Sequence, residues 1–427
     1  MDYTVTKSSL KGSLRIPSSK SQTLRAILFG ALGKSKTHIH HYLPSPDTNA
    51  MMQACRLLGA SIDATPQTLL IEGVNGKIKQ VDDVIHAGNS GILLRFITAI
   101  AAQSAHYTVL TGDHSIRHQR PMQPLLEALV QLGAWATSTK GDGFAPLVIK
   151  GPLHPGEAHL TGEDSQPISS LLIATAFSKG PTTLNVRHPG EKPWIGLTLN
   201  WFDRLGIPYE NHQFSRYQLK GHAQYAGFDY RVPGDLSSAA FPIAAALLTQ
   251  SELTLHNIDL TDAQGDKQLI SIFIQMGAQI DYDNNQKTLF VKKGAHLKGI
   301  TVDINDFIDS LPILAVVGCF AEGITHIKNA KVARQKECDR LCCMTMELRK
   351  MGAQIIEEED ALIVHHTPLH AAAVSSHRDH RIAMALTVAA LALKGESLIS
   401  NVECVAKTYP NFLEHFLSVG ANIRKKE

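Results

Sequence analysis

The chain has 427 residues, which is more than one hydrophobic core usually serves, so we expect two domains. Apolar residues make up 44% of it and charged residues 19%, which is typical of a globular protein. The 41 Lys and Arg residues nearly balance the 39 Asp and Glu residues, and this argues against a nucleic-acid or membrane-surface protein. Any basic residues that bind anions must therefore gather locally.

One pattern recurs six times along the chain. An amphipathic helix ends in an apolar residue, a glycine and a small residue, and a strand follows. The glycines lie between 68 and 75 residues apart, at Gly59, Gly133, Gly206, Gly277, Gly352 and Gly420. A glycine after a helix adopts the left-handed C′ conformation without steric cost. The spacing therefore predicts six copies of one structural unit.

A second series of segments alternates with the first. Each is a nearly continuous apolar helix that follows a polar cluster, and helices that are apolar all round are buried. In chain order these helices begin near Ser21, Ser90, Ser165, Asp235, Asp309 and Asp379. Each unit is predicted to be a buried helix, a strand, a surface helix and a strand. Six units favour two similar α/β domains of three units each.

The starts of the buried helices are candidate anion sites. A helix N-terminus has partial positive charge and unpaired N–H groups, which suit phosphates and carboxylates. Asp235, Ser237 and Ser238 also fit a simple capping role, and the sequence leaves both interpretations open. A basic residue beside a helix start, such as Lys20 or Arg381, is unfavourable unless an anion binds there.

Several basic residues lie at or near these helix starts, where an unpaired buried charge would be costly. They are Lys20, Arg25, Arg95, Arg120, Lys336, Arg340, Arg381 and Lys407. Two carboxylates, Asp309 and Glu337, are candidates for moving protons near a bound substrate. An N-cap role for Asp309 and a surface ion pair for Glu337 remain the alternatives. His380 is the histidine expected nearest the site.

Other classes of protein lack support in the sequence. No GxGxxG, GxxxxGK[ST] or GxSxG motif marks a dinucleotide, P-loop or hydrolase site. The six cysteines form no CxxC pair and show no zinc-ligand spacing, so we expect reduced thiols and no metal. The first residues contain no apolar signal core, and no apolar stretch reaches about 18 residues. A cytoplasmic protein is expected.

Six ordered motifs resemble those of the enolpyruvyl transferases, and of their shikimate-pathway type. They are KSQTLRA at 20–26, GNSGILLR at 88–95, RPM at 120–122, KECDR at 336–340, DHRIAM at 379–384 and KTYP at 407–410. The resemblance extends over nearly the whole chain. It implies a two-domain inside-out α/β barrel, in which residues 1–18 and 233–427 form the C-terminal domain and residues 19–232 the N-terminal domain. The active site is then expected in the cleft between them.

The resemblance also implies an activity and its residues. Family members of this type transfer the enolpyruvyl group of phosphoenolpyruvate to the 5-hydroxyl of shikimate 3-phosphate. Residues expected to bind shikimate 3-phosphate are Lys20, Ser21, Arg25, Ser165, Gln166, Asp309 and Lys336. Residues expected to bind phosphoenolpyruvate are Lys20, Gly91, Arg120, Gln166, Arg340, Arg381 and Lys407. Asp309, Glu337 and Lys20 are expected to share the proton transfers, with no metal or cofactor, no nucleic-acid or membrane partner, and a monomeric chain.

Some positions depart from the family pattern. Asp164 stands in the family's SSQ motif, and Glu191 and Trp194 replace Ser and Tyr in its SxPY motif, so two acids lie where a phosphate is expected. Ile92 replaces a Thr beside Gly91, which predicts reduced sensitivity to the inhibitor glyphosate. Two alternatives stay open: transfer to a different ring alcohol, and a catalytically inactive binding protein.

Overall fold

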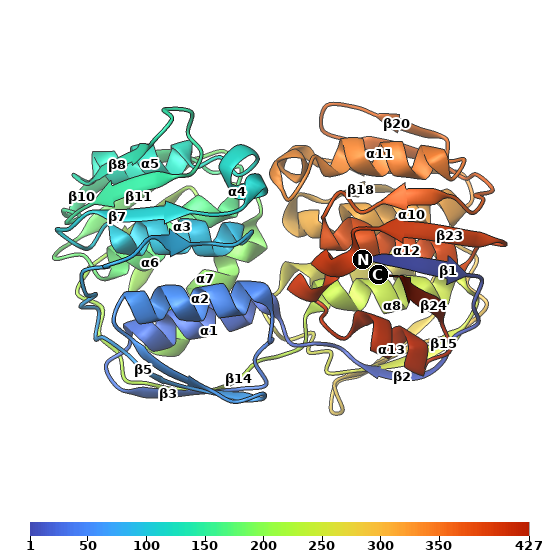
Figure 1. Cartoon of the computed structure of the whole chain (residues 1–427), viewed down its shortest axis with the longest axis horizontal. Coiled ribbons are helices and arrows are strands. Elements are labelled where there is room, and N and C mark those ends of the chain that lie inside the picture. Colours follow the sequence, from blue (N-terminus) through green and yellow to red (C-terminus); the bar gives the residue numbers. More distant parts are fainter. Residues whose placement is uncertain (427) are drawn as a thin grey trace. The chain divides into compact units, whose positions relative to one another are not determined.

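The computed structural model of the chain describes residues 1–426, which divide into two compact units. The N-terminal unit is Lys20–Val232, and the C-terminal unit is Met1–Ser19 together with the chain from Pro233 onward (Figure 1). Each unit has its own apolar core. No helix of the described residues is both long and apolar enough to span a membrane.

The N-terminal unit contains seven helices and twelve strands among its described residues. The helices are α1 (Lys20–Leu32), α2 (Pro46–Leu57), α3 (Gly91–Ala101), α4 (His114–His118), α5 (Gln123–Gln131), α6 (Ser165–Ala176) and α7 (Lys192–Leu205). The strands are β3 (Lys36–His40), β4 (Ser61–Ala64), β5 (Thr68–Glu72), β6 (Ile85–His86), β7 (Thr108–Thr111), β8 (Trp135–Ser138), β9 (Leu147–Lys150), β10 (Gly156–Thr161), β11 (Thr182–Arg187), β12 (Tyr209–His212), β13 (Arg216–Leu219) and β14 (Asp229–Arg231).

The C-terminal unit repeats this composition and adds short 3-10 helices. Its helices are α8 (Leu236–Leu248), η1 (Gly265–Lys267), α9 (Gln268–Gln275), η2 (Asn305–Ser310), α10 (Leu311–Phe320), η3 (Lys331–Gln335), α11 (Arg340–Lys350), α12 (His380–Leu391), η4 (Val402–Lys407) and α13 (Phe412–Ser418). Its strands are β1 (Asp2–Thr6), β2 (Lys11–Arg15), β15 (Glu252–His256), β16 (Ile280–Asp283), β17 (Thr288–Val291), β18 (Thr301–Asp303), β19 (Ile324–Lys328), β20 (Ile355–Glu357), β21 (Leu362–His365), β22 (Ala373–Ser375), β23 (Glu396–Ser400) and β24 (Asn422–Lys426).

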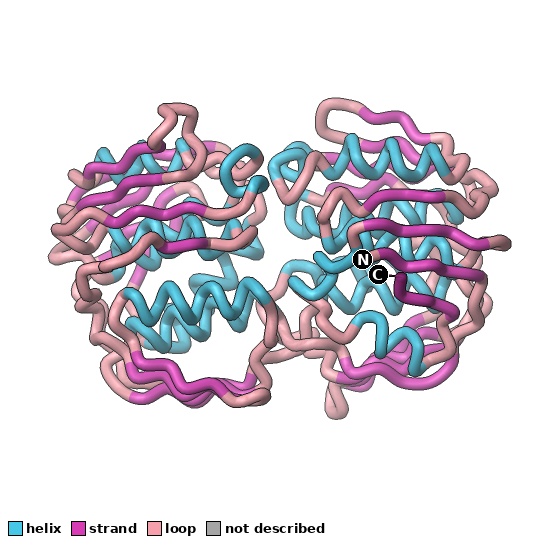
Figure 2. Tube along the Cα trace, viewed as in Figure 1, coloured by secondary structure: helices cyan, strands magenta, loops and turns pink. Residues whose placement is uncertain are grey.

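The strands of the described residues form six sheets with one topology. Each sheet has four strands, and in each one parallel pair is followed by two antiparallel pairs, as in the order β10-β11-β13-β12. Within each unit the sheets lie outside and the almost wholly buried helices lie inside (Figure 2), whereas helices such as α9 and α13 are partly exposed. The six predicted repeats are therefore confirmed, with three in the N-terminal unit and three in the C-terminal unit.

Segments that are distant in sequence complete one sheet of the N-terminal unit and two sheets of the C-terminal unit, where β2 pairs with β15 in a parallel arrangement. In the N-terminal unit, β14 pairs with β3 in a parallel arrangement. In the C-terminal unit, β1 pairs with both β23 and β24. The first strand of the chain therefore occupies the middle of a sheet whose other strands come from the last repeat.

The predicted helices and glycines are confirmed, but the predicted number of strands is wrong. α1, α3, α6, α8, α10 and α12 are almost wholly buried. All six repeat glycines have positive φ, from 68° at Gly206 to 112° at Gly277. Each of the six repeats has four strands rather than two. The strand after each glycine turns back in a hairpin, and a further strand joins the edge of the sheet. These strands are only two to six residues long, too short to show a clear alternation.

Candidate active site

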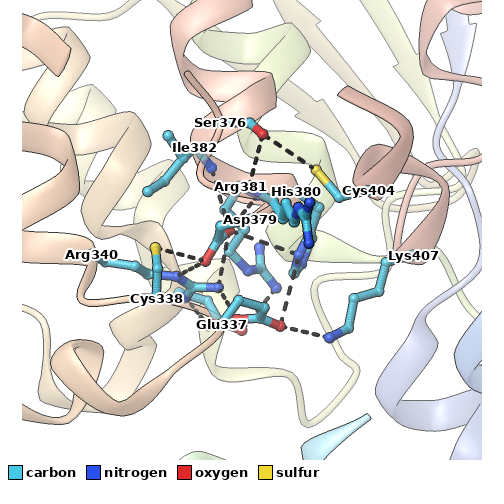
Figure 3. A network of polar contacts seen from close by, with 12 residues as sticks. Glu337, Cys338, Arg340, Ser376, Asp379, His380, Arg381, Ile382, Cys404 and Lys407 are labelled. Atoms are coloured by element: carbon cyan, nitrogen blue, oxygen red, sulfur yellow. Dashed lines mark hydrogen bonds and ion pairs between the residues drawn. The ribbon is translucent and has the colours of Figure 1, made fainter. Parts of the chain in front are cut away.

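In the C-terminal unit, carboxylates near the starts of α10, α11 and α12 surround one guanidinium group. Arg340, the first residue of α11, lies fully inside the protein, and its three nitrogens each contact a different carboxylate (Figure 3). Nε donates to Asp379 Oδ2 at 2.7 Å, Nη1 to Asp309 Oδ1 at 2.7 Å, and Nη2 to Glu337 Oε2 at 2.9 Å. Burial alone would lower the pKa of Arg340, but these carboxylates hold it well above its ordinary value. The side chain is therefore a permanent cation that fixes all three acids.

The second oxygens of two of these acids extend the network. Glu337 Oε1 accepts a hydrogen bond from Lys407 Nζ at 2.7 Å, and Asp309 Oδ2 accepts one from Arg381 Nη2 at 2.7 Å. Arg381 Nη2 also donates to Ser237 Oγ at 2.9 Å. The structure thus brings together five residues that the sequence singled out: Asp309, Glu337, Arg340, Arg381 and Lys407. Lys336 is buried next to Glu337.

Arg381 retains unused binding capacity. Its Nε and Nη1 are buried, and within residues 1–426 neither has a hydrogen-bond partner. A buried guanidinium with unpaired N–H groups is costly unless an anion completes it. Because a guanidinium binds a carboxylate or phosphate through two parallel hydrogen bonds, Arg381 is suited to an anionic ligand.

A buried helix begins near Asp309 as predicted, but the alternative role of Asp309 as its N-cap is wrong. α10 begins at Leu311, and Asp309 lies in the preceding 3-10 helix η2. Its carboxylate does not cap the helix, because it accepts charge-assisted hydrogen bonds from Arg340 and Arg381, which are stronger than a bond from a backbone N–H. Asp379, in contrast, does cap α12 by accepting from Arg381 N at 2.8 Å.

A further acid in this unit went unnoticed in the sequence. Asp266 in η1 is buried, and neither of its carboxylate oxygens has a hydrogen-bond partner in the described part of the chain. Its pKa is raised to about 8, first by burial and then by the nearby carboxylate of Asp309, while Arg381 opposes both effects. Asp266 stands in an ordinary polar stretch, TDAQGDKQ, which shows no pattern that would have identified it.

In the N-terminal unit, three residues expected to bind phosphoenolpyruvate lie together at the start of α3. A Cβ atom added to Gly91 would lie 3.0 Å from Arg95 Nη1, 3.4 Å from Gln166 Oε1 and 3.6 Å from Arg120 Cζ. Arg95 Nη1 also donates to Gln166 Oε1 at 2.9 Å. Any side chain at position 91 would contact these groups. Because residue 91 is a glycine, one anion could contact both the backbone N–H groups and the guanidinium groups.

Arg25 on α1 is a second buried cation of this unit. Its guanidinium donates to Thr198 Oγ1, Ser21 O and Trp194 O, at 3.0 to 3.3 Å, and all three partners are neutral. No carboxylate within residues 1–426 neutralises it, and burial lowers its pKa to about 9. Lys20 Nζ lies 3.9 Å from Asp47 Oδ2. An anion near Arg25 would supply the missing charge.

The two acids that depart from the family pattern are paired within this unit. Asp164 caps α6 through Gln166 N, and its Oδ2 lies 3.0 Å from Arg95 Nη2. Glu191 is buried, and its Oε2 accepts from both N and Oγ of Ser165 at 2.9 Å. The hydroxyl hydrogen of Ser165 is therefore already donated to a carboxylate, which competes with the predicted role of Ser165 in binding a phosphate.

Among the described residues, one group of side chains has the spacing of metal ligands. Glu337, Asp379 and His380 offer ligand atoms within 4.8 Å of one another. However, oxygens of both acids already accept hydrogen bonds from Arg340, and Glu337 accepts another from Lys407. We interpret the group as part of the ion-pair network rather than a metal centre.

The raised pKa of Asp266 makes the stability of the protein depend on pH. The folded-state pKa of about 8 exceeds the usual value of 3.8, so folding disfavours the ionised form. The stability cost of this group therefore grows as the pH rises from about 4 to about 8 and then levels off. We expect the free energy of unfolding of Asp266→Asn to be nearly that of the wild type at pH 4.5. At pH 8 it should be more stable than the wild type by at least about 1 kcal/mol.

Denaturant unfolding at both pH values measures the difference. Asp281→Asn, at an acid that pairs with Lys292 at the surface of the same unit, serves as the control and should show no such trend. A loss of stability in Asp266→Asn at pH 8 would contradict the assignment of a buried, unpaired carboxyl group.

Comparisons with known proteins point to one family. The family described as EPSP synthase (3-phosphoshikimate 1-carboxyvinyltransferase) matches residues 5–416. A 3-phosphoshikimate 1-carboxyvinyltransferase of Chlamydia pneumoniae is 43% identical over 427 residues, which cover 100% of this chain and 95% of the relative.

Solved structures give the same result. An EPSP synthase structure from Acinetobacter baumannii matches with a TM-score of 0.84 and 28% identity, covering 100% of both chains. The enolpyruvyl transferase NikO from Streptomyces tendae, at 19% identity, shares the fold with a TM-score of 0.80 over 99% of this chain and 98% of its own. With a family match over nearly its full length and relatives above 40% identity, this chain belongs to the EPSP synthase family.

Proposed function

We propose that this protein transfers the enolpyruvyl group of phosphoenolpyruvate to the 5-hydroxyl of shikimate 3-phosphate and releases phosphate. The observation that supports this best is the ion-pair network around Arg340, in which Asp309 and Glu337 are held at fixed positions beside Arg381. Both substrates are multiply charged anions, and the unpaired N–H groups of Arg381 need an anion. Membership of the family supports the same reaction.

The reaction needs a base at the 5-hydroxyl and an acid at C3 of phosphoenolpyruvate. Asp309, about one-fifth exposed, is proposed to take the hydroxyl proton as the oxygen bonds to C2. Glu337 is proposed to deliver a proton to C3 in the same step, which produces a tetrahedral intermediate that still bears the phosphate. Return of a C3 proton to Glu337 then expels phosphate and leaves the enol ether.

Two cations contact Glu337. Arg340 and Lys407 each donate to one of its oxygens. Both are also proposed ligands of phosphoenolpyruvate, so the anionic substrate would share these donors with Glu337. Lys20 is proposed to assist the proton transfers at the acceptor.

The residues of the N-terminal unit are proposed to bind the substrates. Gly91, Arg120 and Gln166 would contact phosphoenolpyruvate, and Lys20, Ser21, Arg25 and Gln166 would contact shikimate 3-phosphate. The buried charge of Arg25, whose partners are all neutral, supports an anionic acceptor. Lys336, a residue of the C-terminal unit, is also a proposed ligand of shikimate 3-phosphate. We also propose that the protein is a monomer and that it lies in the cytoplasm. Its free cysteines support the second of these proposals.

A phosphate-release assay tests the function and separates it from its alternatives. Phosphate should appear only when phosphoenolpyruvate and shikimate 3-phosphate are both present. We expect Asp309→Asn and Glu337→Gln to lower kcat roughly 100-fold or more, because each removes a proton-transfer group. Glu396→Gln, at an exposed acid of the same unit, should retain full activity.

The outcomes are distinct. Release with another ring alcohol but not with shikimate 3-phosphate would indicate a different acceptor. Binding of phosphoenolpyruvate without release under any condition would indicate an inactive binding protein. Full activity of both variants, with unchanged thermal unfolding, would refute the proposed roles of Asp309 and Glu337.

The pairing of Glu191 with Ser165 predicts an effect on the acceptor. Glu191 places a negative charge beside a residue proposed to bind a phosphate dianion, and it takes the Ser165 hydroxyl hydrogen. We expect Glu191→Ser to lower KM for shikimate 3-phosphate about fivefold, because a like charge is removed and the hydroxyl is released. KM for phosphoenolpyruvate should change little.

Two further variants separate these causes. Glu191→Gln removes the charge but can still accept the hydrogen bond, so it should give only part of the gain. Glu163→Gln, at a neighbouring exposed acid, is the control for charge. A higher KM in Glu191→Ser would show that Glu191 orders the site for the acceptor.

The position of Ile92 predicts tolerance of glyphosate. Gly91 is enclosed by Arg95 and Gln166, so a bulky side chain at position 92 that rotates Gly91 inward would crowd an inhibitor larger than phosphoenolpyruvate. We expect inhibition only above micromolar concentrations, and about tenfold tighter inhibition of Ile92→Thr. Ile92→Val should behave like Ile92→Thr if bulk is the cause, whereas Ile97→Val, elsewhere on α3, should not. Micromolar or tighter inhibition of the unchanged protein would contradict the prediction.

A further inference from the structure

A buried acid, Glu347, lies on α11 about two helical turns after Arg340. Its Oε1 lies 2.7 Å from His377 Nε2, and its Oε2 accepts from Ser375 N at 3.0 Å. Lys350 Nζ donates to both oxygens, at 2.9 and 2.8 Å. Ser375 is the last residue of β22, and His377 lies in the turn that leads to α12. One carboxylate therefore joins α11 to the segment before α12.

The carboxyl group of Glu347 is ionised despite its position inside the protein. Burial disfavours the charged form, but hydrogen bonds from Lys350, Ser375 N and His377 outweigh it and hold the pKa of Glu347 below its ordinary value. An ionised carboxylate can only accept hydrogen bonds, so His377 must donate from Nε2. The bond between Glu347 and His377 therefore fixes both the position and the tautomer of the imidazole.

The turn between β22 and α12 has a backbone that needs support. His377 and Arg378 are consecutive residues in the left-handed region, with φ of 51° and 59°. Such conformations are unfavourable for residues with side chains and persist where surrounding contacts impose them. Ser376 Oγ accepts from Arg378 N at 3.0 Å and donates to Asn401 O at 2.8 Å. Glu347 holds the residues on either side of Ser376, so the turn is fixed from two directions.

The turn ends at Asp379, whose carboxylate contacts two arginines of the candidate site (Figure 3). Asp379 N donates to Ser376 O at 2.9 Å, so the turn determines where Asp379 lies. Asp379 Oδ2 accepts from Arg340 Nε at 2.7 Å, and its Oδ1 accepts from Arg381 N at 2.8 Å. A shift of the turn would therefore move the Arg340 guanidinium directly and Arg381 through the first turn of α12.

Arg340 and Glu347 form two bridges from α11 to the same segment. Arg340 contacts Asp379, and Glu347 contacts the turn before it. Seven residues of an α-helix rise about 10 Å, so the two bridges are well separated along α11. One bridge alone would let the segment pivot about a single contact. Two bridges fix its direction as well as its distance from α11.

Stability alone is a poor explanation for an acid at this place. Burial of a carboxylate costs free energy, and a buried ion pair often adds little net stability. The side chains of Lys350 and His377 are 46% and 26% exposed, so solvent could reach both if Glu347 were neutral. The contacts of Glu347 therefore contribute more to the geometry of the turn than to the stability of the fold.

We propose that Glu347 is a positioning residue for the binding of phosphoenolpyruvate. By holding the turn before Asp379, it keeps the guanidinium groups of Arg340 and Arg381 where they would bind the substrate. It acts through the backbone of residues 375–379 and not by contact with phosphoenolpyruvate. This inference rests on the proposed function, in which both arginines are ligands of phosphoenolpyruvate.

The first test is the steady-state kinetics of Glu347→Gln, followed by phosphate release. This variant removes the charge and turns an NH₂ group toward groups that can only donate. We expect KM for phosphoenolpyruvate to rise about tenfold, because misplaced guanidinium groups bind the substrate less well. KM for shikimate 3-phosphate should change less than about twofold, since most of its proposed ligands lie in the N-terminal unit. A role in stability alone would lower the amount of active protein and leave both KM values unchanged.

A pair of variants at His377 isolates one hydrogen bond. The amide nitrogen of Gln reaches about as far from the backbone as Nε2 of histidine, whereas that of Asn is shorter. His377→Gln should therefore keep the bond to Glu347 and nearly the wild-type KM for phosphoenolpyruvate. His377→Asn, which tolerates positive φ, should lose the bond and raise this KM about threefold. Arg349→Gln loses a bond from α11 to Ile355 O, away from the turn, and should leave KM unchanged.

Amide hydrogen exchange gives a readout that does not need activity. In Glu347→Gln, the amides of Ser375 and of residues 379–382 should exchange roughly tenfold faster than in the wild type, because the turn that holds them is released. The amides of α10, which Glu347 does not contact, should exchange as before.

An unchanged KM for phosphoenolpyruvate in folded Glu347→Gln overturns the proposal, and so do equal KM values in His377→Gln and His377→Asn. If Glu347→Gln does not fold, the two variants at His377 decide. If the wild type releases no phosphate, the proposed function fails and hydrogen exchange decides the separate question. Unchanged exchange at residues 379–382 would then overturn the positioning role, whereas faster exchange would support it.

Discussion

The burial of the Arg340 guanidinium among three carboxylates is the interaction on which the candidate site depends. A buried cation is tolerated only when its hydrogen-bonding groups are satisfied by opposite charge, and Asp379, Asp309 and Glu337 supply one oxygen for each nitrogen. The same bonds fix two acids that would otherwise be flexible. A loss of any partner would leave charge uncompensated in the interior, so the geometry of the acids and the stability of the fold are linked.

The fold provides this arrangement through repetition. Each buried helix begins where a polar side chain can cap it, and in the C-terminal unit the starts of α8 and α12 and the turn before α10 meet around Arg381. The N-terminal unit repeats the same geometry with different chemistry. Its Asp164 caps α6, but its buried cation Arg25 donates only to neutral groups, whereas Arg340 donates to three carboxylates. The same repeated structure therefore forms two clusters, one in each unit, that differ in their balance of charge.

Much of this architecture could be predicted from the sequence, and the limits have physical causes. The six glycines from Gly59 to Gly420 all adopt positive φ at the end of a helix. This conformation depends on the residue itself, so the six repeats could be identified from the sequence. The hairpin strands were missed because segments such as Ile85–His86 are too short to show alternation. For Asp309, the pattern at the start of a helix suggested a cap. Its carboxylate instead accepts hydrogen bonds from Arg340 and Arg381, which are 31 and 72 residues away in the sequence. Asp266 and the pairing of Glu191 with Ser165 depend on tertiary contacts that no spacing reveals.

The position of β1 has a consequence for how the two units form. This strand pairs with β23 and β24, which lie at the opposite end of the chain, whereas β14 and β3 of the N-terminal unit both lie within Lys20–Val232. During synthesis, the N-terminal unit can close its last sheet before the rest of the chain exists. The first strand, although it leaves the ribosome earliest, must wait with its backbone N–H and C=O groups unpaired until its neighbours are made.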